Sequence, residues 1–269
     1  MNIGIFDSGL GGLMVTSALI KHRPEYSYRY LGDTKHVPYG NRSHATIRLY
    51  TEEAIRYLAT EQQCSLIVIA CNTASAQALR EIQQDFLPQN FPNLRVLGVI
   101  VPTVEAVCQL PVKRVGLLAT QVTVNSEAYL HEVAKRRPDL EVIQQAAPLL
   151  VPLIEYDGLE WVEPIIRHYL KPLLAQHIEA LILGCTHYAA LVDVIKPLLP
   201  PEVSLICQND IMPASLSHYL ERHQDVAGRL DRNSQHRFLV SDLGEGYSDL
   251  ASSLYGEKIQ LELVNYESL

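Results

Sequence analysis

The sequence lacks any apolar run that approaches the ~18 residues needed to cross a membrane. Its first residues, MNIGIFDSG, also lack the basic region and apolar stretch of a secretory signal peptide. We therefore expect a cytoplasmic protein with no membrane partner. With 269 residues, of which 48% are hydrophobic, the chain is long enough to bury one large core or two smaller ones.

Basic residues are scarce and scattered. Lysine and arginine together number 22 against 30 aspartates and glutamates, which gives a formal net charge of −8. We expect no nucleic-acid partner, because binding to phosphates requires a positive stripe. A small anionic ligand is still compatible with this charge, because helix N-termini and a few donors suffice to hold it.

The cysteines form no C-x-x-C pair, and their number is odd. Neither a disulfide framework nor a zinc site is therefore indicated, and we expect free thiols and no bound metal. The five cysteines are Cys64, Cys71, Cys108, Cys185 and Cys207.

Short β-rich segments alternate with longer segments of helical periodicity, such as residues 43–60 and 125–137. This alternation predicts an α/β fold with mainly parallel sheets covered by helices. The expected strands are 2–6, 26–31, 65–70, 94–99, 113–119, 140–145, 179–184, 203–207, 236–241 and 259–264.

Two parts of the chain repeat each other weakly. IGIFDS from Ile3 resembles VGLLAT from Val115, and LIVIACNT, which ends at Thr73, resembles LILGCTH, which ends at His187. The echo predicts two similar α/β halves, each with a first strand that ends in small polar residues and a later strand that ends in cysteine.

The two halves are expected to be two domains that face each other. Two strand candidates follow residue 207, so we expect the chain to return to its first domain after completing the second. The predicted domains are residues 1–98 with 208–269, and residues 99–207. Because ligands bind beyond the carboxyl ends of the strands in such sheets, we expect the site in the cleft between the domains.

The segment FDSGLGGL, residues 6–13, follows the first expected strand. It is not a dinucleotide-binding fingerprint, because Met14 occupies the place of the third glycine, and it lacks the G-K-S/T of a P-loop. The strand ends instead in Asp7 and Ser8, before glycines that let the backbone approach a ligand. The alternative is that Asp7 only caps the next helix and that the glycines only form the turn.

The stretch LIVIACNTAS, residues 66–75, ends a buried strand on Cys71 and continues with residues that can cap a helix. A free cysteine taken alone is most often an ordinary buried residue. At a helix N-terminus, however, the pKa of a thiol is expected to fall from about 8.5 toward neutrality. Cys71 is therefore a candidate base or nucleophile.

LILGCTHYAAL repeats this arrangement with Cys185, and His187 follows two residues later. The histidine is either a functional partner of the thiol or a structural hydrogen-bonding group, and the spacing does not choose between them. Two equivalent thiols on opposite sides of one cleft suit the inversion of a stereocentre, in which one removes a proton and the other returns one to the opposite face. Such an inversion needs no cofactor in principle.

The polar loop LGDTKHVPYGNRS, residues 31–43, offers Tyr39, the backbone of Gly40 and Asn41 as groups that can hold a carboxylate. An ordinary β-turn is the alternative explanation of its VPYG segment. Glu155 is a weaker candidate, because a solvated helix residue is its default interpretation. Three hydroxyls around an expected helix start are either donors or caps, namely those of Thr120, Thr123 and Ser126.

Five motifs, in order and spacing, resemble those of the cofactor-independent glutamate racemases of bacteria. They are IGIFDSGLGGL, LGDTKHVPYGNRS, IVIACNTASA, VTVNSEAY and LILGCTHY, and they span the chain up to about residue 190. The resemblance implies two α/β domains related by pseudo-twofold symmetry, with the active site between them. It also implies interconversion of L- and D-glutamate without a cofactor, which supplies D-glutamate for peptidoglycan synthesis, and it is compatible with a homodimer.

The resemblance further implies a role for individual residues. Two cysteines are the catalytic acid and base in this family, so Cys71 would act on the D-enantiomer and Cys185 on the L-enantiomer. Asp7 and His187 would assist them, and Glu155 occupies the place of a further acidic residue. The implied substrate contacts are Asp7, Ser8, Tyr39, Gly40, Asn72, Thr73, Thr186 and His187.

The chain also departs from the family pattern at two places. Many members have a cysteine where this chain has Ala147, and ICQNDIMPASL, residues 206–216, replaces a more usual acidic-Ser-Gly stretch. Three other functions stay open at this point. They are racemisation of aspartate or hydantoins on the same two-cysteine plan, solute binding with incidental thiols, and thiol redox chemistry, which the missing C-x-x-C disfavours.

Overall fold

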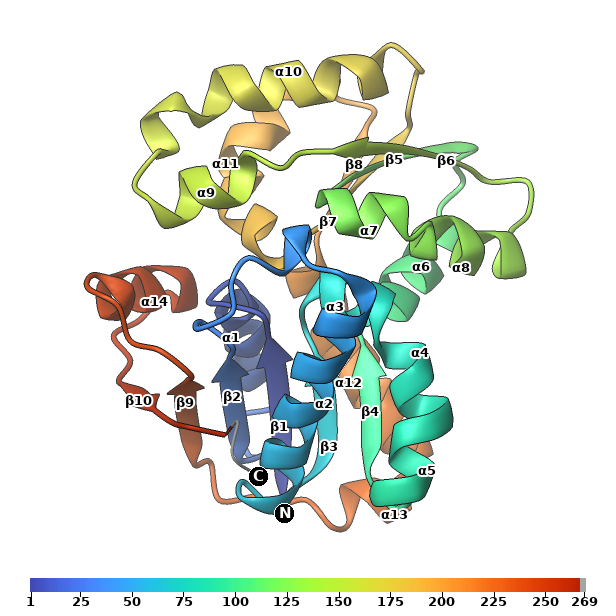
Figure 1. Cartoon of the computed structure of the whole chain (residues 1–269). Coiled ribbons are helices and arrows are strands. Elements are labelled where there is room, and N and C mark those ends of the chain that lie inside the picture. Colours follow the sequence, from blue (N-terminus) through green and yellow to red (C-terminus); the bar gives the residue numbers. More distant parts are fainter. Residues whose placement is uncertain (267–269) are drawn as a thin grey trace.

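The computed structural model describes residues 1–266 and contains two β-sheets, one in each half of the molecule (Figure 1). The first sheet comprises β1 (Asn2–Asp7), β2 (Tyr28–Gly32), β3 (Cys64–Ile69), β4 (Arg95–Gly98), β9 (His236–Val240) and β10 (Leu261–Leu263). The second comprises β5 (Arg114–Ala119), β6 (Glu141–Ala146), β7 (Ala180–Gly184) and β8 (Ser204–Ile206). All ten expected strands are present, with ends that differ by at most two residues from the prediction.

The two sheets share one topology. The first has the order β10-β9-β2-β1-β3-β4 and the second the order β6-β5-β7-β8, so the arrangement β2-β1-β3-β4 is repeated. All strand pairs that join the described strands are parallel. The predicted α/β fold with two similar halves is therefore confirmed. β9 and β10 extend the first sheet, whereas the predicted residue limits of the two domains stay a prediction.

Helices cover both sheets. The longer ones are α1 (Gly12–His22), α2 (His44–Thr60), α6 (Ile100–Cys108), α8 (Ala128–Arg136), α10 (Val162–Leu174), α12 (Gln208–Arg222) and α14 (Tyr247–Tyr255). The shorter α-helices are α3 (Asn72–Gln77), α4 (Leu79–Glu81), α5 (Leu87–Asn90), α7 (Gln121–Asn125), α9 (Leu150–Glu155), α11 (Val192–Ile195) and α13 (Gln224–Ala227). The 3-10 turns are η1 (Tyr39–Asn41), η3 (Leu159–Trp161), η4 (Thr186–Leu191) and η5 (Lys196–Leu198), and η2 (Ile82–Phe86) is a π-helical turn.

The sequence predicted residue ranges for two helices. One of these helices forms as expected, and the other begins later than predicted. α2 fills the predicted range 43–60 and follows its N-cap, Ser43, whose Oγ accepts a hydrogen bond from the Thr46 N–H at 3.3 Å. The helix expected over residues 125–137 begins only at Ala128. The chain breaks there because Glu127 is left-handed, with φ 53°, and the Ser126 hydroxyl binds the backbone in place of helical partners.

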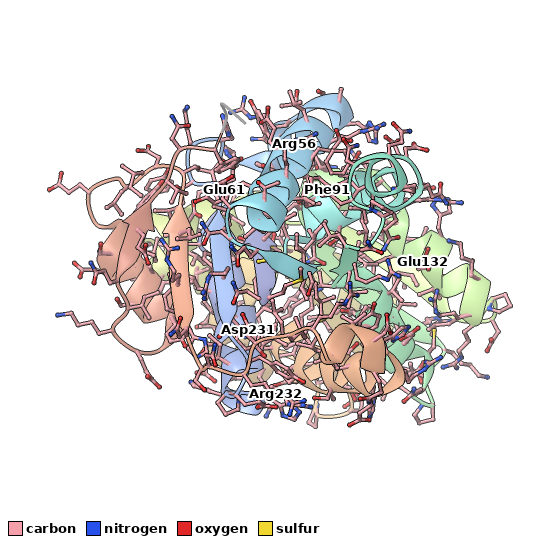
Figure 2. The ribbon with its side chains drawn as sticks, turned by 90° about the horizontal axis from the view of Figure 1, so that it is seen from below. Arg56, Glu61, Phe91, Glu132, Asp231 and Arg232 are labelled. Carbon is pink, nitrogen blue, oxygen red and sulfur yellow. The ribbon has the colours of Figure 1, made fainter. Side chains whose placement is uncertain are left out.

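The central strands are buried on both faces. Every residue of β1, β3 and β7 is buried, as expected for parallel strands covered by helices on both sides. The first sheet rises toward the second half from the end of the molecule where the N-terminus lies (Figure 1). Figure 2 shows that end from below, where the Met1 ammonium group pairs with Asp231 at 2.9 Å. The carboxyl ends of the strands therefore face the second half.

Within residues 1–266, no helix combines the length and the apolar character that crossing a membrane requires.

Gly32, the last residue of β2, tests how tightly the loop after β1 is packed. A Cβ atom at Gly32 would lie 2.3 Å from the carbonyl oxygen of Gly9, which already accepts a hydrogen bond from the Tyr30 hydroxyl at 2.6 Å. We predict that Gly32→Ala lowers the free energy of unfolding by about 1–3 kcal/mol, the usual cost of overpacking. Urea denaturation measures this change.

The matched control is Gly244→Ala, because the nearest atoms to an added Cβ there are those of the Tyr247 ring, at 3.5 Å or more. Its free energy of unfolding should stay close to that of the unmodified protein. An equal loss of unfolding free energy in both variants would contradict a steric constraint specific to the loop after β1.

Candidate active site

Cys71 lies just beyond the carboxyl end of β3, where α3 begins. Its Sγ accepts a hydrogen bond from the Ala74 N–H at 3.4 Å, so the thiol itself caps the helix. The Ser8 hydroxyl lies 3.2 Å from the same sulfur. These groups meet because β1 and β3 are neighbouring parallel strands, whose carboxyl ends lie at one edge of the sheet.

Cys185 occupies the equivalent place after β7, before the turn η4. Its Sγ lies 4.0 Å from Nδ1 of His187, and the opposite ring nitrogen, Nε2, lies 2.8 Å from the Glu155 carboxylate on α9. The Glu155 side chain is 17% exposed, so its default interpretation as a solvated helix residue is wrong. The three side chains form a connected row, cysteine to histidine to glutamate.

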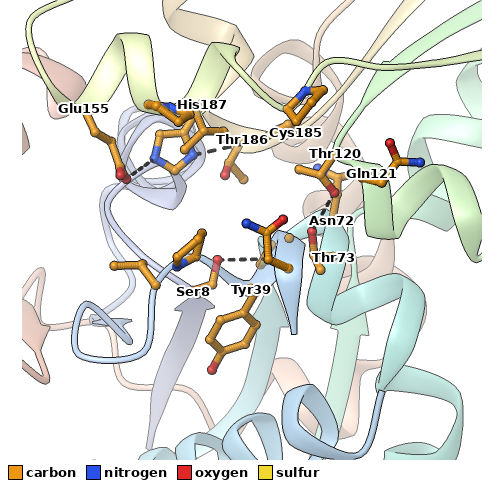
Figure 3. A pocket seen from close by; sticks show the side chains of 18 of the residues that line it. Ser8, Tyr39, Asn72, Thr73, Thr120, Gln121, Glu155, Cys185, Thr186 and His187 are labelled. Atoms are coloured by element: carbon orange, nitrogen blue, oxygen red, sulfur yellow. Dashed lines mark hydrogen bonds and ion pairs between the residues drawn. The ribbon is translucent and has the colours of Figure 1, made fainter. Parts of the chain in front are cut away.

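A cavity of about 160 Å³ between the two halves brings both thiols to one space (Figure 3). That volume is below the roughly 300–1,000 Å³ typical of clefts for drug-sized ligands, so the cavity suits a molecule as small as an amino acid. Of the residues proposed as catalytic groups or substrate contacts, those that line it are Ser8, Tyr39, Gly40, Asn41, Cys71, Asn72, Thr73, Glu155, Cys185, Thr186 and His187. Cys64, Cys108 and Cys207 do not line it, and all five cysteines are free thiols, as predicted.

Asp7 was predicted to be a catalytic residue and a substrate contact, but it does not line the cavity. Its side chain is fully buried, and its carboxylate accepts hydrogen bonds from the Gly9 N–H at 3.1 Å and from the Thr186 hydroxyl at 3.3 Å. The second bond joins the two halves of the chain directly beside the thiols. Asp7 can therefore influence the cavity through its charge and through its hydrogen bond with Thr186, which lines the cavity.

Burial has the largest effect on the pKa of Cys71. Loss of hydration raises the pKa of this thiol to about 12, and the nearby charge of Asp7 adds to the increase. The hydrogen bonds from Ser8 and Ala74 act in the opposite direction with a smaller effect. The expectation that a helix N-terminus lowers this pKa toward neutrality is therefore wrong, because desolvation outweighs those two donors.

The pKa of His187 is shifted in the opposite direction to that of an ordinary buried histidine. Burial favours its neutral form, but hydrogen bonds and charge from Cys185 and Glu155 together raise the pKa of His187 well above its ordinary value. A protonated ring donates to Glu155 from one nitrogen and faces Cys185 with the other. Burial also raises the pKa of Asp7, and the charge of His187 opposes that increase. The two thiols thus have unlike neighbours, a carboxyl group beside Cys71 and an imidazolium beside Cys185.

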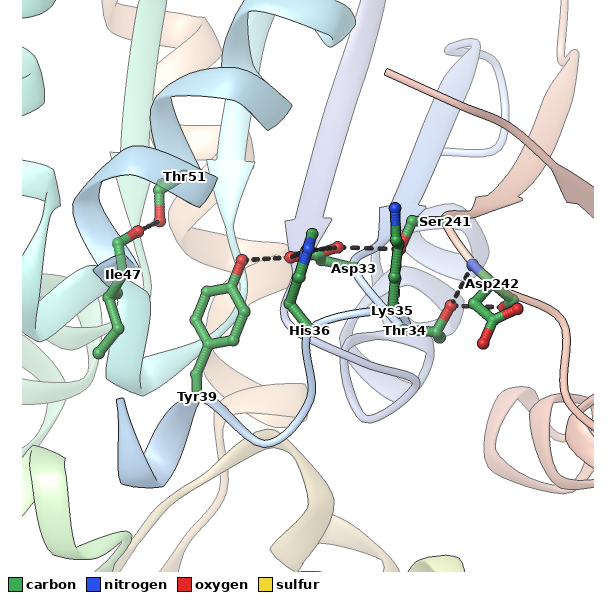
Figure 4. Close-up of polar contacts among 9 residues, drawn as sticks. All are labelled: Asp33, Thr34, Lys35, His36, Tyr39, Ile47, Thr51, Ser241 and Asp242. Atoms are coloured by element: carbon green, nitrogen blue, oxygen red, sulfur yellow. Dashed lines mark hydrogen bonds and ion pairs between the residues drawn. The ribbon is translucent and has the colours of Figure 1, made fainter. Parts of the chain in front are cut away.

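A buried aspartate that the sequence analysis did not single out anchors the loop of Tyr39 (Figure 4). The Asp33 carboxylate accepts hydrogen bonds from the Tyr39 hydroxyl at 2.6 Å and the Ser241 hydroxyl at 2.8 Å, and it lies 3.0 Å from Nδ1 of His36. The hydroxyl of Tyr39 is therefore directed away from the cavity, and its ring forms part of the wall. The position of Asp33 directly after β2 was the available sequence signal.

The threonine motif caps a helix, which is one of its two predicted alternatives. The Thr120 hydroxyl accepts from the Thr123 N–H at 3.2 Å and so caps α7, and it also lines the cavity, 3.0 Å from the hydroxyl of Thr73 in the other half. Its predicted role as a donor to a ligand stays a prediction. Further lining residues that the sequence analysis did not propose as contacts are mostly apolar. They are Val37, Pro38, Gln121, Ala147, Pro148, Val151, Pro152, Tyr156 and Tyr188.

Among residues 1–266, no group of three or more His, Cys, Asp or Glu side chains is arranged to hold a metal ion.

The chain matches the family described as Asp/Glu/hydantoin racemase over residues 14–212. It is 35% identical over 277 residues to a glutamate racemase of Dinoroseobacter shibae, with 98% of this chain and 99% of the relative covered. It is 37% identical over 271 residues to a glutamate racemase of Synechocystis, with 96% and 92% covered. The crystal structure of the Francisella tularensis glutamate racemase in complex with D-glutamate has a TM-score of 0.88 at 32% identity and covers 100% of this chain and 98% of that one. The chain belongs to the Asp/Glu/hydantoin racemase family.

Proposed function

We propose that this protein is a glutamate racemase that interconverts L- and D-glutamate by proton transfer between two cysteines, Cys71 and Cys185, without a cofactor. The observation that supports this proposal most strongly is the single cavity that both thiols line, one from each half of the chain. Inversion of a stereocentre requires acid–base groups on opposite faces of one carbon, and two equivalent strand ends supply them. The similarity to glutamate racemases over nearly the whole chain favours glutamate as the substrate.

The proposed proton transfer starts from one thiolate and one thiol. With D-glutamate bound, the Cys71 thiolate removes the α-proton and becomes a thiol, and the Cys185 thiol gives its proton to the opposite face and becomes a thiolate. The reverse direction exchanges these roles. The substrate ammonium group would favour the Cys71 thiolate, since a nearby positive charge lowers a thiol pKa that burial has raised.

The carbanion formed on the way needs strong stabilisation, because the adjacent carboxylate is already negative. The cavity offers the Asn72 amide and the hydroxyl of Thr73 as donors. These donors are positioned by the fold before the reaction begins, and a hydrogen bond aimed at developing charge in a protein cavity is stronger than one in water.

The biological setting belongs to the same proposal. D-glutamate would supply peptidoglycan synthesis in the bacterial cytoplasm, and glutamate would be the only ligand that the cavity requires. The proposal also includes the absence of nucleic-acid and membrane partners, and it is compatible with a homodimer. Light scattering of the purified protein measures the oligomeric state.

The two-cysteine proposal predicts complementary partial reactions in D₂O. Cys185→Ala should lose more than about 10³-fold of its racemisation rate, yet it should still exchange the α-hydrogen of D-glutamate through Cys71. Cys71→Ala should lose racemisation equally and exchange only L-glutamate. NMR of the α-hydrogen together with chiral chromatography separates exchange from inversion.

Cys108→Ala is the matched control, because Cys108 is a free thiol outside the cavity. Its racemisation should match that of the unmodified protein. Near-normal racemisation by either Cys71→Ala or Cys185→Ala, or exchange of both enantiomers by one of them, would contradict the two-base mechanism.

Glu155 supports a separate prediction on pH. The Cys185 and Glu155 side chains raise the pKa of His187, so the ring stays protonated to a higher pH than an ordinary histidine and loses its proton only above the raised pKa. Glu155→Gln removes one of these two causes. We predict that the alkaline limb of the kcat/KM profile, where His187 deprotonates, moves to lower pH in this variant.

Glu160→Gln is the control, since the exposed Glu160 belongs to the next turn and does not line the cavity. Its profile should coincide with that of the unmodified protein between pH values at which the enzyme stays folded. An alkaline limb that does not move in Glu155→Gln would show that His187 does not carry the essential proton.

A further inference from the structure

Gln208, the first residue of α12, is buried directly behind the cavity. Its side-chain amide forms two hydrogen bonds with the amide of Asn72, which lines the cavity: Asn72 Nδ2 donates to Gln208 Oε1, and Gln208 Nε2 donates to Asn72 Oδ1, both at 2.8 Å. Gln208 lies in the ICQNDIMPASL segment, where the chain departs from the usual family pattern. The pair joins residues 136 positions apart in the chain.

A pair of amides can in principle reverse both of its members, because an oxygen and an NH₂ group have nearly the same shape. Thr103 on α6 prevents this reversal. Its hydroxyl donates its single proton to the Val99 carbonyl at 2.7 Å, so its oxygen can only accept from Gln208 at 3.4 Å. The Gln208 NH₂ group must therefore face Thr103, which leaves Oε1 of Gln208 to accept from Asn72.

Tyr129 on α8 completes the arrangement. Its hydroxyl accepts from the Gln208 NH₂ group at 3.2 Å and donates to Oδ1 of Asn72 at 2.8 Å. One N–H of Gln208 is directed to Asn72, so the other is shared between the hydroxyl oxygens of Thr103 and Tyr129. Oδ1 of Asn72 accepts two hydrogen bonds, which occupy both of its lone pairs. The four side chains form a network of one fixed polarity that ends at the backbone carbonyl of Val99, the residue before α6.

Asn72 presents its side-chain amide to the cavity (Figure 3). One of its two N–H groups is bonded to Gln208, and within residues 1–266 no hydrogen bond is recorded for the other. We propose that Gln208 is a positioning residue, which holds Asn72 so that this second N–H is offered to a carboxylate oxygen of the substrate. This inference rests on the proposed function, because glutamate brings two carboxylates and therefore only acceptors at those ends.

The first test is Gln208→Leu, which keeps the side-chain volume but removes the amide. Without its partner, the Asn72 amide can rotate and offer its oxygen to the substrate. We expect KM for both enantiomers to rise about tenfold, the effect of weakening one hydrogen bond to a charged group. The value of kcat should change by less than about threefold, because the same contact is lost in the bound substrate and in the transition state.

The second test is Gln208→Glu, whose effect depends on pH. A protonated carboxyl group reproduces the amide pattern, since its C=O accepts from Asn72 Nδ2 and its O–H donates to Asn72 Oδ1. An ionised carboxylate can only accept, so it repels Oδ1 and reverses Asn72. We expect KM close to that of the unmodified protein at low pH and a rise in KM as the introduced carboxyl ionises, at a pH that burial displaces upward.

The matched control is Gln62→Leu. Gln62 is also buried and also donates to a tyrosine hydroxyl, that of Tyr57 at 2.9 Å, but it lies before β3, at the end of the sheet remote from the cavity. A loss of stability without a change in KM is expected for this variant. It separates the general cost of removing a buried amide from the specific effect on the substrate.

The outcomes distinguish the two levels of the proposal. If the unmodified protein racemises glutamate while Gln208→Leu and Gln208→Glu keep its KM at every pH, only the positioning role is overturned. A fall in kcat with unchanged KM, or an equal and pH-independent rise of KM in both variants, would also overturn it. Failure of the unmodified protein to racemise glutamate would overturn both levels. Should Gln208→Leu not fold, the pH dependence of Gln208→Glu decides alone.

Discussion

The parallel pairing of β1 with β3, and of β5 with β7, is the constraint from which the arrangement of the site follows. Phe6 is aligned with Ile69 in the first sheet, and Ala119 with Gly184 in the second, so the residues that come next leave each sheet together. Ser8 and Cys71 emerge at one edge, and Cys185 emerges at the corresponding edge of the other half. Because the two sheets share one strand order, these edges are equivalent, and their approach creates a cavity with a thiol from each side.

The two sheets share one topology, but contacts between the halves make the two sides of the cavity chemically different. Thr186 donates to Asp7 and Thr73 meets Thr120, so the two halves are in contact at two separate points beside the cavity. Burial raises the pKa of the Cys71 thiol, while hydrogen bonds and charge from Cys185 and Glu155 raise the pKa of His187 despite its burial.

Much of the fold and the outline of the site could be predicted from local sequence. Buried strands such as SLIVIA are apolar runs bounded by polar residues, and the cysteines that follow two of them are visible as a repeated pattern. The start of α2 was predictable because Ser43 is a residue type that favours the N-cap position. The break before α8 was not, because the Ser126 hydroxyl competes with the helix only through the precise placement of its neighbours.

Features that depend on distant partners could not be predicted. The role of Glu155 depends on His187, and the role of Asp33 on Ser241 at the end of β9, and neither partner lies near in the sequence. The pKa of Cys71 depends on its burial in the folded structure, which outweighs the local hydrogen bonds from Ser8 and the Ala74 N–H. Gln208 is likewise meaningful only once the return of the chain places it behind Asn72.

We propose that two thiols that line one cavity invert a carbon centre without a cofactor. Circular dichroism of L-glutamate incubated with protein that has been dialysed against chelator and freed of pyridoxal phosphate tests it most directly. The account predicts decay of the signal to zero, the value of an equal mixture, at an unchanged rate after dialysis. A signal that persists, or that decays only when a cofactor or metal is added back, would contradict it.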